Sequence, residues 1–73
     1  MRLTRHAKNR LRLIARRVPA IDESRFLKAL DITIGSERDV KGNRKLIVQI
    51  DAILLRAIVD DQKQIVITIW REE

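Results

Sequence analysis

The chain of 73 residues contains no cysteine, which excludes a disulfide framework, a thiolate nucleophile and a cysteine-based metal site. Because it also has a single histidine, an all-protein zinc site is not expected. It has no tyrosine, one phenylalanine and one tryptophan, so its core must be aliphatic. Eleven residues are isoleucine, whose branched side chain favours strands, and a sheet is therefore expected to supply much of the core.

Long hydrophobic runs are also absent. No stretch approaches the about 18 consecutive apolar residues of a membrane span, and the basic N-terminal residues are not followed by the apolar segment of a signal peptide. The sequence therefore predicts a cytoplasmic protein without membrane contact. Its two glycines lie far apart, which argues against a glycine-rich phosphate loop, and its length predicts a single domain, residues 1–73.

The first seventeen residues contain no acidic side chain and seven basic ones. Residues 18–73 carry nine basic and ten acidic side chains, so the opening segment (+7) accounts for the whole excess of the net charge of +6. Such localisation predicts an anionic partner, either nucleic acid or an acidic protein. The seven basic residues are Arg2, Arg5, Lys8, Arg10, Arg12, Arg16 and Arg17.

Two helices are predicted in the N-terminal half. Thr4 can cap the first, over about residues 4–18, in which apolar side chains recur at helical spacing. Asp22 can cap the second, over about residues 22–30. The apolar stripe of the first helix consists of Leu3, Ala7, Leu11, Ile14, Ala15 and Val18.

After the second helix the hydrophobic period shortens toward two, which is typical of strands. The short connections between the strands fit antiparallel hairpins. This order predicts an α+β fold in which two N-terminal helices pack on an antiparallel β-meander of about four strands. The expected strands cover about residues 32–40, 45–50, 53–60 and 65–71, and the first of them is weak.

A helical wheel divides the polar residues of the first helix between two flanks of its apolar stripe. One flank carries Arg5, Lys8, Arg12 and Arg16. The other carries His6, Arg10, Leu13 and Arg17. Because His6 and Arg10 are four residues apart, their side chains can serve one site.

In the last hairpin, matching the apolar faces of the two strands sets an even register. The final strand then has Ile65, Ile67 and Ile69 on one face and Val66, Thr68 and Trp70 on the other. A three-residue loop would place Arg56 directly across from Thr68, and Leu54 across from Trp70. Whether these residues meet His6 depends on the placement of the first helix, which periodicity does not fix.

The opening "LTRHAKNRL" and the ending "IVITIW" resemble a family of small microbial domains. That family begins with a His-Ala-x-x-Arg helix and ends with a strand carrying Thr or Ser two residues before an aromatic. It is grouped with the RelE-like and colicin D-like toxin nucleases, which share a fold of helices followed by four strands. The resemblance covers nearly the whole chain through short motifs, and the link "RRVPAID" departs from the short Arg-Gly-Ile link of typical members.

The resemblance implies a metal-independent RNA endonuclease of the toxin type, with no cofactor, that cleaves by attack of the 2′-OH on the phosphate. It assigns His6 and Arg10 to the polar pair of the first helix, and Thr68 and Trp70 to the last-strand hydroxyl and aromatic. A histidine has a reference pKa near 6.5 and suits proton transfer, while cations stabilise the charged phosphorane. The predicted catalytic residues are His6, Arg10, Arg56 and Thr68.

Non-catalytic interpretations remain open. The chain can be a nucleic-acid-binding module, or an interaction domain whose basic helix docks an acidic protein such as an antitoxin. His6 can be a surface residue, and Arg56 can pair with Asp51 or Asp60. The weak first strand and the Ile-rich sheet also favour a homodimer. The residues expected to contact RNA are Arg2, Arg5, Lys8, Arg12, Arg16, Arg17 and Trp70.

Overall fold

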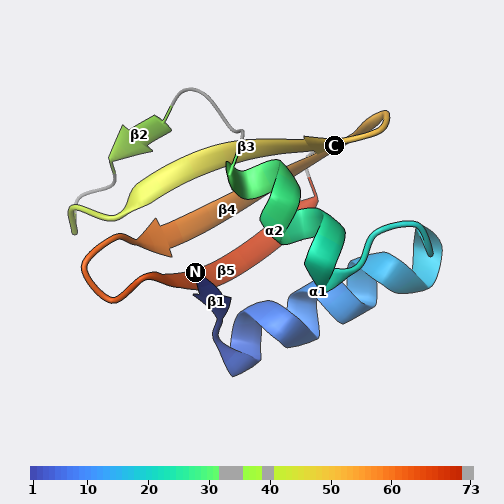
Figure 1. Cartoon of the computed structure of the whole chain (residues 1–73), viewed down its shortest axis with the longest axis horizontal. Helices are drawn as coiled ribbons and strands as arrows, with labels where there is room; N and C mark the ends of the chain where they lie inside the picture. The colour runs from blue at the N-terminus through green and yellow to red at the C-terminus, as the bar shows by residue number, and fades with distance from the viewer. Residues whose placement is uncertain (32–35, 39–40, 72–73) are drawn as a thin grey trace.

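The structure is a computed structural model that describes residues 1–31, 36–38 and 41–71. This part of the chain forms two helices and a sheet of five strands in the order β1-β5-β4-β3-β2 (Figure 1). The predicted α+β class is confirmed. The elements are β1 (Arg2–Leu3), α1 (Arg5–Arg17), α2 (Glu23–Asp31), β2 (Ser36–Arg38), β3 (Arg44–Ile50), β4 (Ile53–Asp60) and β5 (Ile65–Arg71).

The sheet is mixed, so the prediction of a purely antiparallel four-stranded meander is wrong. β1 pairs in parallel with the start of β5, with Arg2 opposite Ile65, and the other neighbouring strands pair antiparallel. The pattern of the sequence does not reveal β1, because two residues are too few to show an alternation. The weak strand expected over residues 32–40 is β2, and residues 32–35 and 39–40 lie outside the described residues.

Both helices begin at the predicted caps. Thr4 Oγ1 accepts a hydrogen bond from the Ala7 N–H at 3.1 Å, and Asp22 Oδ1 accepts one from the Arg25 N–H at 2.8 Å. The helices lie on one face of the sheet, where α1 packs against β5 and α2 against β3 (Figure 1). The buried core between the layers comprises Leu3, Ala7, Leu11, Ile21, Phe26, Leu30, Leu46, Val48, Ile50, Leu55, Ala57, Val59, Val66 and Ile69.

The hairpin of β4 and β5 has the predicted parity but a different register. Trp70 lies opposite Arg56, and Thr68 lies opposite Ile58. The predicted pairs of Arg56 with Thr68 and of Leu54 with Trp70 are therefore wrong. Arg56, Thr68 and Trp70 nevertheless share the face of the sheet opposite α1 and α2, because cross-strand partners point to the same side.

Two extra residues in the hairpin explain this shift. The turn covers four residues, Asp61–Gln64, rather than three, and a β-bulge leaves Ile67 without a partner in β4. One extra residue alone would move the side chains of β5 to the opposite face relative to those of β4. The two extra residues together return them to the predicted face, but they shift the pairing by two residues along β5. As a consequence Val66 and Ile69 are the buried residues of β5, and the prediction that they lie on opposite faces is wrong.

Candidate nucleic-acid interface

α1 runs along the edge of β5 and is attached to it by polar side chains. Within the described residues, β1 pairs only with the start of β5, and beyond it this edge has no strand neighbour. There Thr4 Oγ1 donates a hydrogen bond to the carbonyl of Ile67 at 3.0 Å, and Arg10 Nε donates one to the carbonyl of Ile69 at 3.3 Å. These contacts protect an edge that would otherwise be open to pairing with another strand.

His6 lies between these two contacts in sequence and reaches the same strand. Its Nε2 atom is 3.0 Å from Thr68 Oγ1, and either atom can donate the hydrogen bond, depending on which ring nitrogen carries the proton. His6 is exposed, whereas Thr68 is half-buried. The structure thus brings together two predicted catalytic residues that lie 62 positions apart in the sequence.

Arg10 and Trp70, two further predicted site residues, line one hollow of about 330 Å³ between α1 and the end of β5. Arg56 is placed opposite Trp70 and not opposite Thr68, so it lies beside this hollow rather than at the His6 contact. The sequence pattern does not indicate that Leu13, Ile14 and Arg71 also line the hollow. The wheel places Leu13 on the flank of Arg10, but only the register of β5 brings Trp70 and Arg71 to it.

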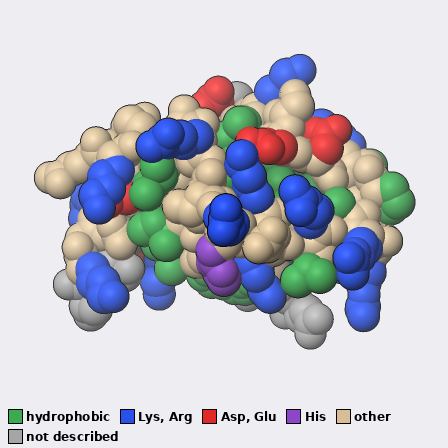
Figure 2. Space-filling view, turned by 90° about the horizontal axis from the view of Figure 1, so that it is seen from below, with side chains coloured by type: hydrophobic (Ala, Val, Ile, Leu, Met, Phe, Trp, Pro, Cys, Tyr) green, Lys and Arg blue, Asp and Glu red, His purple; other side chains and the backbone are tan. Residues whose placement is uncertain are grey.

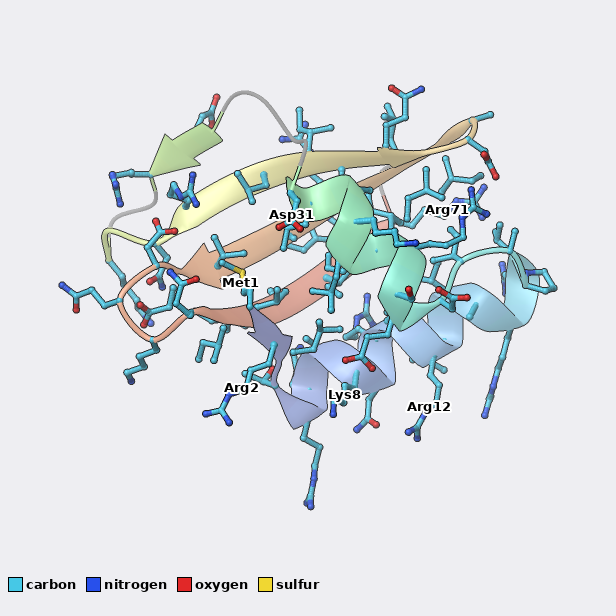
Figure 3. All side chains as sticks on the ribbon, in the orientation of Figure 1. Met1, Arg2, Lys8, Arg12, Asp31 and Arg71 are labelled. Carbon is cyan, nitrogen blue, oxygen red and sulfur yellow. The ribbon has the colours of Figure 1, made fainter. Side chains whose placement is uncertain are left out.

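The other flank of α1 points away from the sheet. We call Arg5, Lys8, Arg12 and Arg16 the outer flank; all four are exposed. Arg5, Lys8 and Arg12 line a second hollow of about 330 Å³ together with Asn9. Arg2, Lys8 and Arg12 follow one another along this side (Figure 3). Figure 2, which faces α1, shows Lys and Arg side chains across the surface and the single His among them.

The cations of residues 1–17 differ from Arg25 and Arg44 in their partners. None of the seven forms an ion pair with an acidic side chain of the described residues. In contrast, Arg25 pairs with Asp51 at 3.1 Å and Arg44 pairs with Asp61 at 2.6 Å. Asp60 accepts hydrogen bonds from the backbone of the 61–64 turn. Asp22 and Glu23 line a hollow with Lys8 and Arg12 but form no ion pair with them, so the cations of α1 have no paired acid among the described residues.

The described residues include no group of three or more His, Cys, Asp or Glu side chains arranged to hold a metal ion. No helix in these ranges has the length and apolar character needed to cross a membrane. Neither a protein-family model, nor a curated protein, nor a solved structure matches the chain. The resemblance to RelE-like nucleases therefore stays a prediction, and function must be inferred from the geometry of the site.

Proposed function

We propose that this protein binds RNA through the basic surface of α1. The observation that carries the proposal is the set of seven cations in residues 1–17, none of which is paired with an acid of the described residues. Like charges gathered on one helix repel one another and lower its stability. A phosphate backbone supplies the missing counter-charge and releases its own counterions on binding, which favours association.

The geometry of the outer flank suits an extended polyanion. Arg5 and Arg16 are eleven residues apart, which corresponds to about 16 Å along a helix that rises 1.5 Å per residue. Exposed guanidinium groups at helical spacing can each contact a phosphate oxygen pair in bidentate geometry. The hollow between Arg5, Lys8 and Arg12 offers a place where one phosphate can meet several of these groups.

The test compares two variants with the same loss of charge. The flank variant combines Arg5→Gln, Lys8→Gln and Arg12→Gln. The control combines substitutions of exposed lysines outside α1, namely Lys28→Gln, Lys45→Gln and Lys63→Gln. Binding of a labelled RNA is measured by fluorescence anisotropy over a series of salt concentrations, with circular dichroism to verify that each variant is folded.

Loss of three phosphate contacts should reduce the slope of log K against log salt by about 2 and weaken binding by about 100-fold at 0.1 M salt. The control should keep nearly the full slope of the unmodified chain. Equal losses in both variants would contradict a site on α1 and leave only attraction by net charge. Absence of RNA binding by the unmodified chain at about 0.15 M salt would overturn the proposal in favour of an acidic protein partner.

A second candidate function, RNA cleavage, is favoured by the hydrogen bond between His6 and Thr68. In this hypothesis the exposed imidazole of His6 takes the proton of a 2′-OH group, while Thr68 orients the ring. The guanidinium of Arg10, four residues along the same flank, stabilises the charge that develops on the phosphate. This is the arrangement that the resemblance to toxin nucleases implies, and an acidic antitoxin would then cover the basic surface of α1.

Incubation of total RNA with the chain in EDTA tests this candidate, with His6→Ala and His6→Gln beside the unmodified protein. Glutamine can keep a hydrogen bond to Thr68 but cannot transfer protons near neutral pH. A nuclease should lose cleavage in both variants while its RNA affinity changes little. Intact RNA after incubation with the unmodified chain at several pH values would exclude cleavage and leave RNA binding as the proposed function.

A further inference from the structure

The hollow between α1 and the end of β5 is lined by both apolar and cationic side chains. Its apolar walls come from Leu13, Ile14 and Trp70, and its rim carries three arginines. Its volume of about 330 Å³ lies at the lower end of the range for small-ligand sites, about 300–1,000 Å³. The residues that line it are Arg10, Leu13, Ile14, Arg17, Trp70 and Arg71.

The apolar walls are partly open to solvent. Leu13 is 50% exposed on a helix whose other exposed side chains are polar or charged. Trp70 is half-buried and lines the same hollow as this leucine. An aromatic ring with an aliphatic neighbour offers a surface on which a flat, uncharged group can stack.

The cationic rim is partly fixed in place. Arg10 donates a hydrogen bond through Nε to the carbonyl of Ile69, and within the described residues its terminal nitrogens make no further hydrogen bond. A guanidinium held at one nitrogen loses less conformational freedom when it binds a ligand. Arg17 and Arg71 add further positive charge to the lining of the hollow.

A ligand that satisfies both features needs an aromatic face and an adjacent anion, which is the chemistry of one nucleotide. In a duplex the faces of the bases are covered by their stacked neighbours, whereas an unpaired base can turn outward onto an aromatic side chain. Building on the RNA binding proposed above, we infer that the ligand is single-stranded and that one of its bases stacks on Trp70 in this hollow. Arg10 and Arg17 then hold the neighbouring phosphate, and the outer flank holds more distant ones.

Trp70 is the single tryptophan of the chain, so its fluorescence reports on this hollow alone. Three probes of equal length distinguish the contributions: a single-stranded RNA, the same backbone without bases, and an RNA duplex. The single strand should quench the fluorescence, because a stacked base contacts the indole. The abasic strand should bind with an affinity lower by about 5- to 150-fold and leave the fluorescence unchanged. The duplex should not quench it either.

A pair of matched variants localises the effect. Leu13→Ala removes an apolar wall of the hollow, and Ile47→Ala removes a side chain of similar exposure, 48%, from β3, which lies two strands from β5 and does not line the hollow. Leu13→Ala should weaken binding of the single strand several-fold and leave binding of the abasic strand unchanged, whereas Ile47→Ala should change neither. A larger loss with Ile47→Ala would overturn the assignment to this hollow and indicate the face of the sheet opposite α1 and α2.

Other outcomes separate this inference from the function on which it rests. Equal affinities for the single-stranded and abasic probes, without quenching, would overturn the stacking site but support binding of phosphates by α1. Tighter binding of the duplex than of the single strand would also overturn it. If none of the three probes binds, both the proposed RNA binding and the stacking site in the hollow are overturned.

Discussion

α1 and α2 are amphipathic helices on the same face of the same sheet, yet they are attached to it differently. α2 is held by apolar burial, since Phe26 is fully buried, Leu30 is nearly so, and both belong to the core. α1 also buries an apolar stripe, but it adds hydrogen bonds from Thr4, His6 and Arg10 to β5. Both helices therefore cover the face of the sheet, and α1 also binds the edge of β5.

The two helices also differ in the partners of their cationic side chains. Arg25 of α2 has its partners within the same chain. It donates hydrogen bonds to the carbonyl of Ala20 at 2.9 Å and to Asp51 at 3.1 Å. The cations of the outer flank of α1 have no such acid among the described residues. The RNA binding proposed above would supply a counter-charge for this unpaired set on α1.

The largest expected effect comes from the apolar anchor of α2. Phe26→Ala removes a fully buried ring and should lower the free energy of unfolding by about 3–5 kcal/mol. Because small domains are stable by about 5–15 kcal/mol in total, this loss should remove a large share of the stability of the chain. Urea denaturation followed by circular dichroism measures it, with Phe26→Leu as the control that keeps much of the apolar volume. A loss below about 1 kcal/mol would contradict burial as the anchor of α2.

The caps of the two helices provide the next comparison. Thr4 Oγ1 both accepts a hydrogen bond from the Ala7 N–H and donates one to the carbonyl of Ile67 on β5, whereas Asp22 only caps α2. Thr4→Val should therefore cost about 2 kcal/mol of stability and Asp22→Ala about 1 kcal/mol. Thermal and urea unfolding of the two variants measure both values. Equal losses would show that the edge contact of Thr4 contributes nothing beyond the cap.

Arginines on the two helices should show opposite effects on stability and on binding. Arg25→Gln removes an exposed ion pair and should cost at most about 1 kcal/mol without changing RNA affinity. Arg12→Gln should leave stability unchanged, because this side chain has no acid partner among the described residues, and should weaken RNA binding about fivefold at 0.1 M salt. Unfolding and anisotropy measurements on the same samples test both. If Arg25→Gln weakened RNA binding and Arg12→Gln did not, the assignment of RNA binding to α1 would be contradicted.

Local features of the fold could be predicted because they follow from short stretches of sequence. The caps at Thr4 and Asp22, the apolar stripe of α1 and the alternation in β4 depend on neighbours a few residues apart. β1 and the bulge at Ile67 could not be predicted in this way. β1 consists of two residues that pair with the other end of the chain, and a bulge depends on packing across the sheet.

The same distinction between local features and contacts of distant residues applies to the candidate site. The wheel places His6 and Arg10 on one flank of α1, and the structure shows that this flank reaches β5. The hollow with Trp70 and Arg71 depends on where α1 lies along the edge of the sheet, which no periodicity in the sequence encodes. The register error between Arg56 and Thr68 arose from the length of one turn and one bulge. Residues on one element could be grouped from the sequence, whereas contacts between elements required the structure.

The smallest expected effect decides how His6 should be interpreted. Its hydrogen bond to Thr68 lies at an exposed position and should contribute about 0.5 kcal/mol to stability. A double-mutant cycle with His6→Ala and Thr68→Val measures this coupling free energy directly by urea unfolding. His6→Gln should recover most of it, because the amide can replace the ring nitrogen as a hydrogen-bond partner.

The size of this coupling free energy separates two roles for the His6 side chain. A coupling of about 0.5 kcal/mol that glutamine restores would show that His6 helps to attach α1 to the edge of β5, like Thr4 and Arg10. A coupling indistinguishable from zero would remove this structural explanation. The role of the imidazole would then lie in contact with RNA, on the flank of α1 that also carries Arg10 and Arg17.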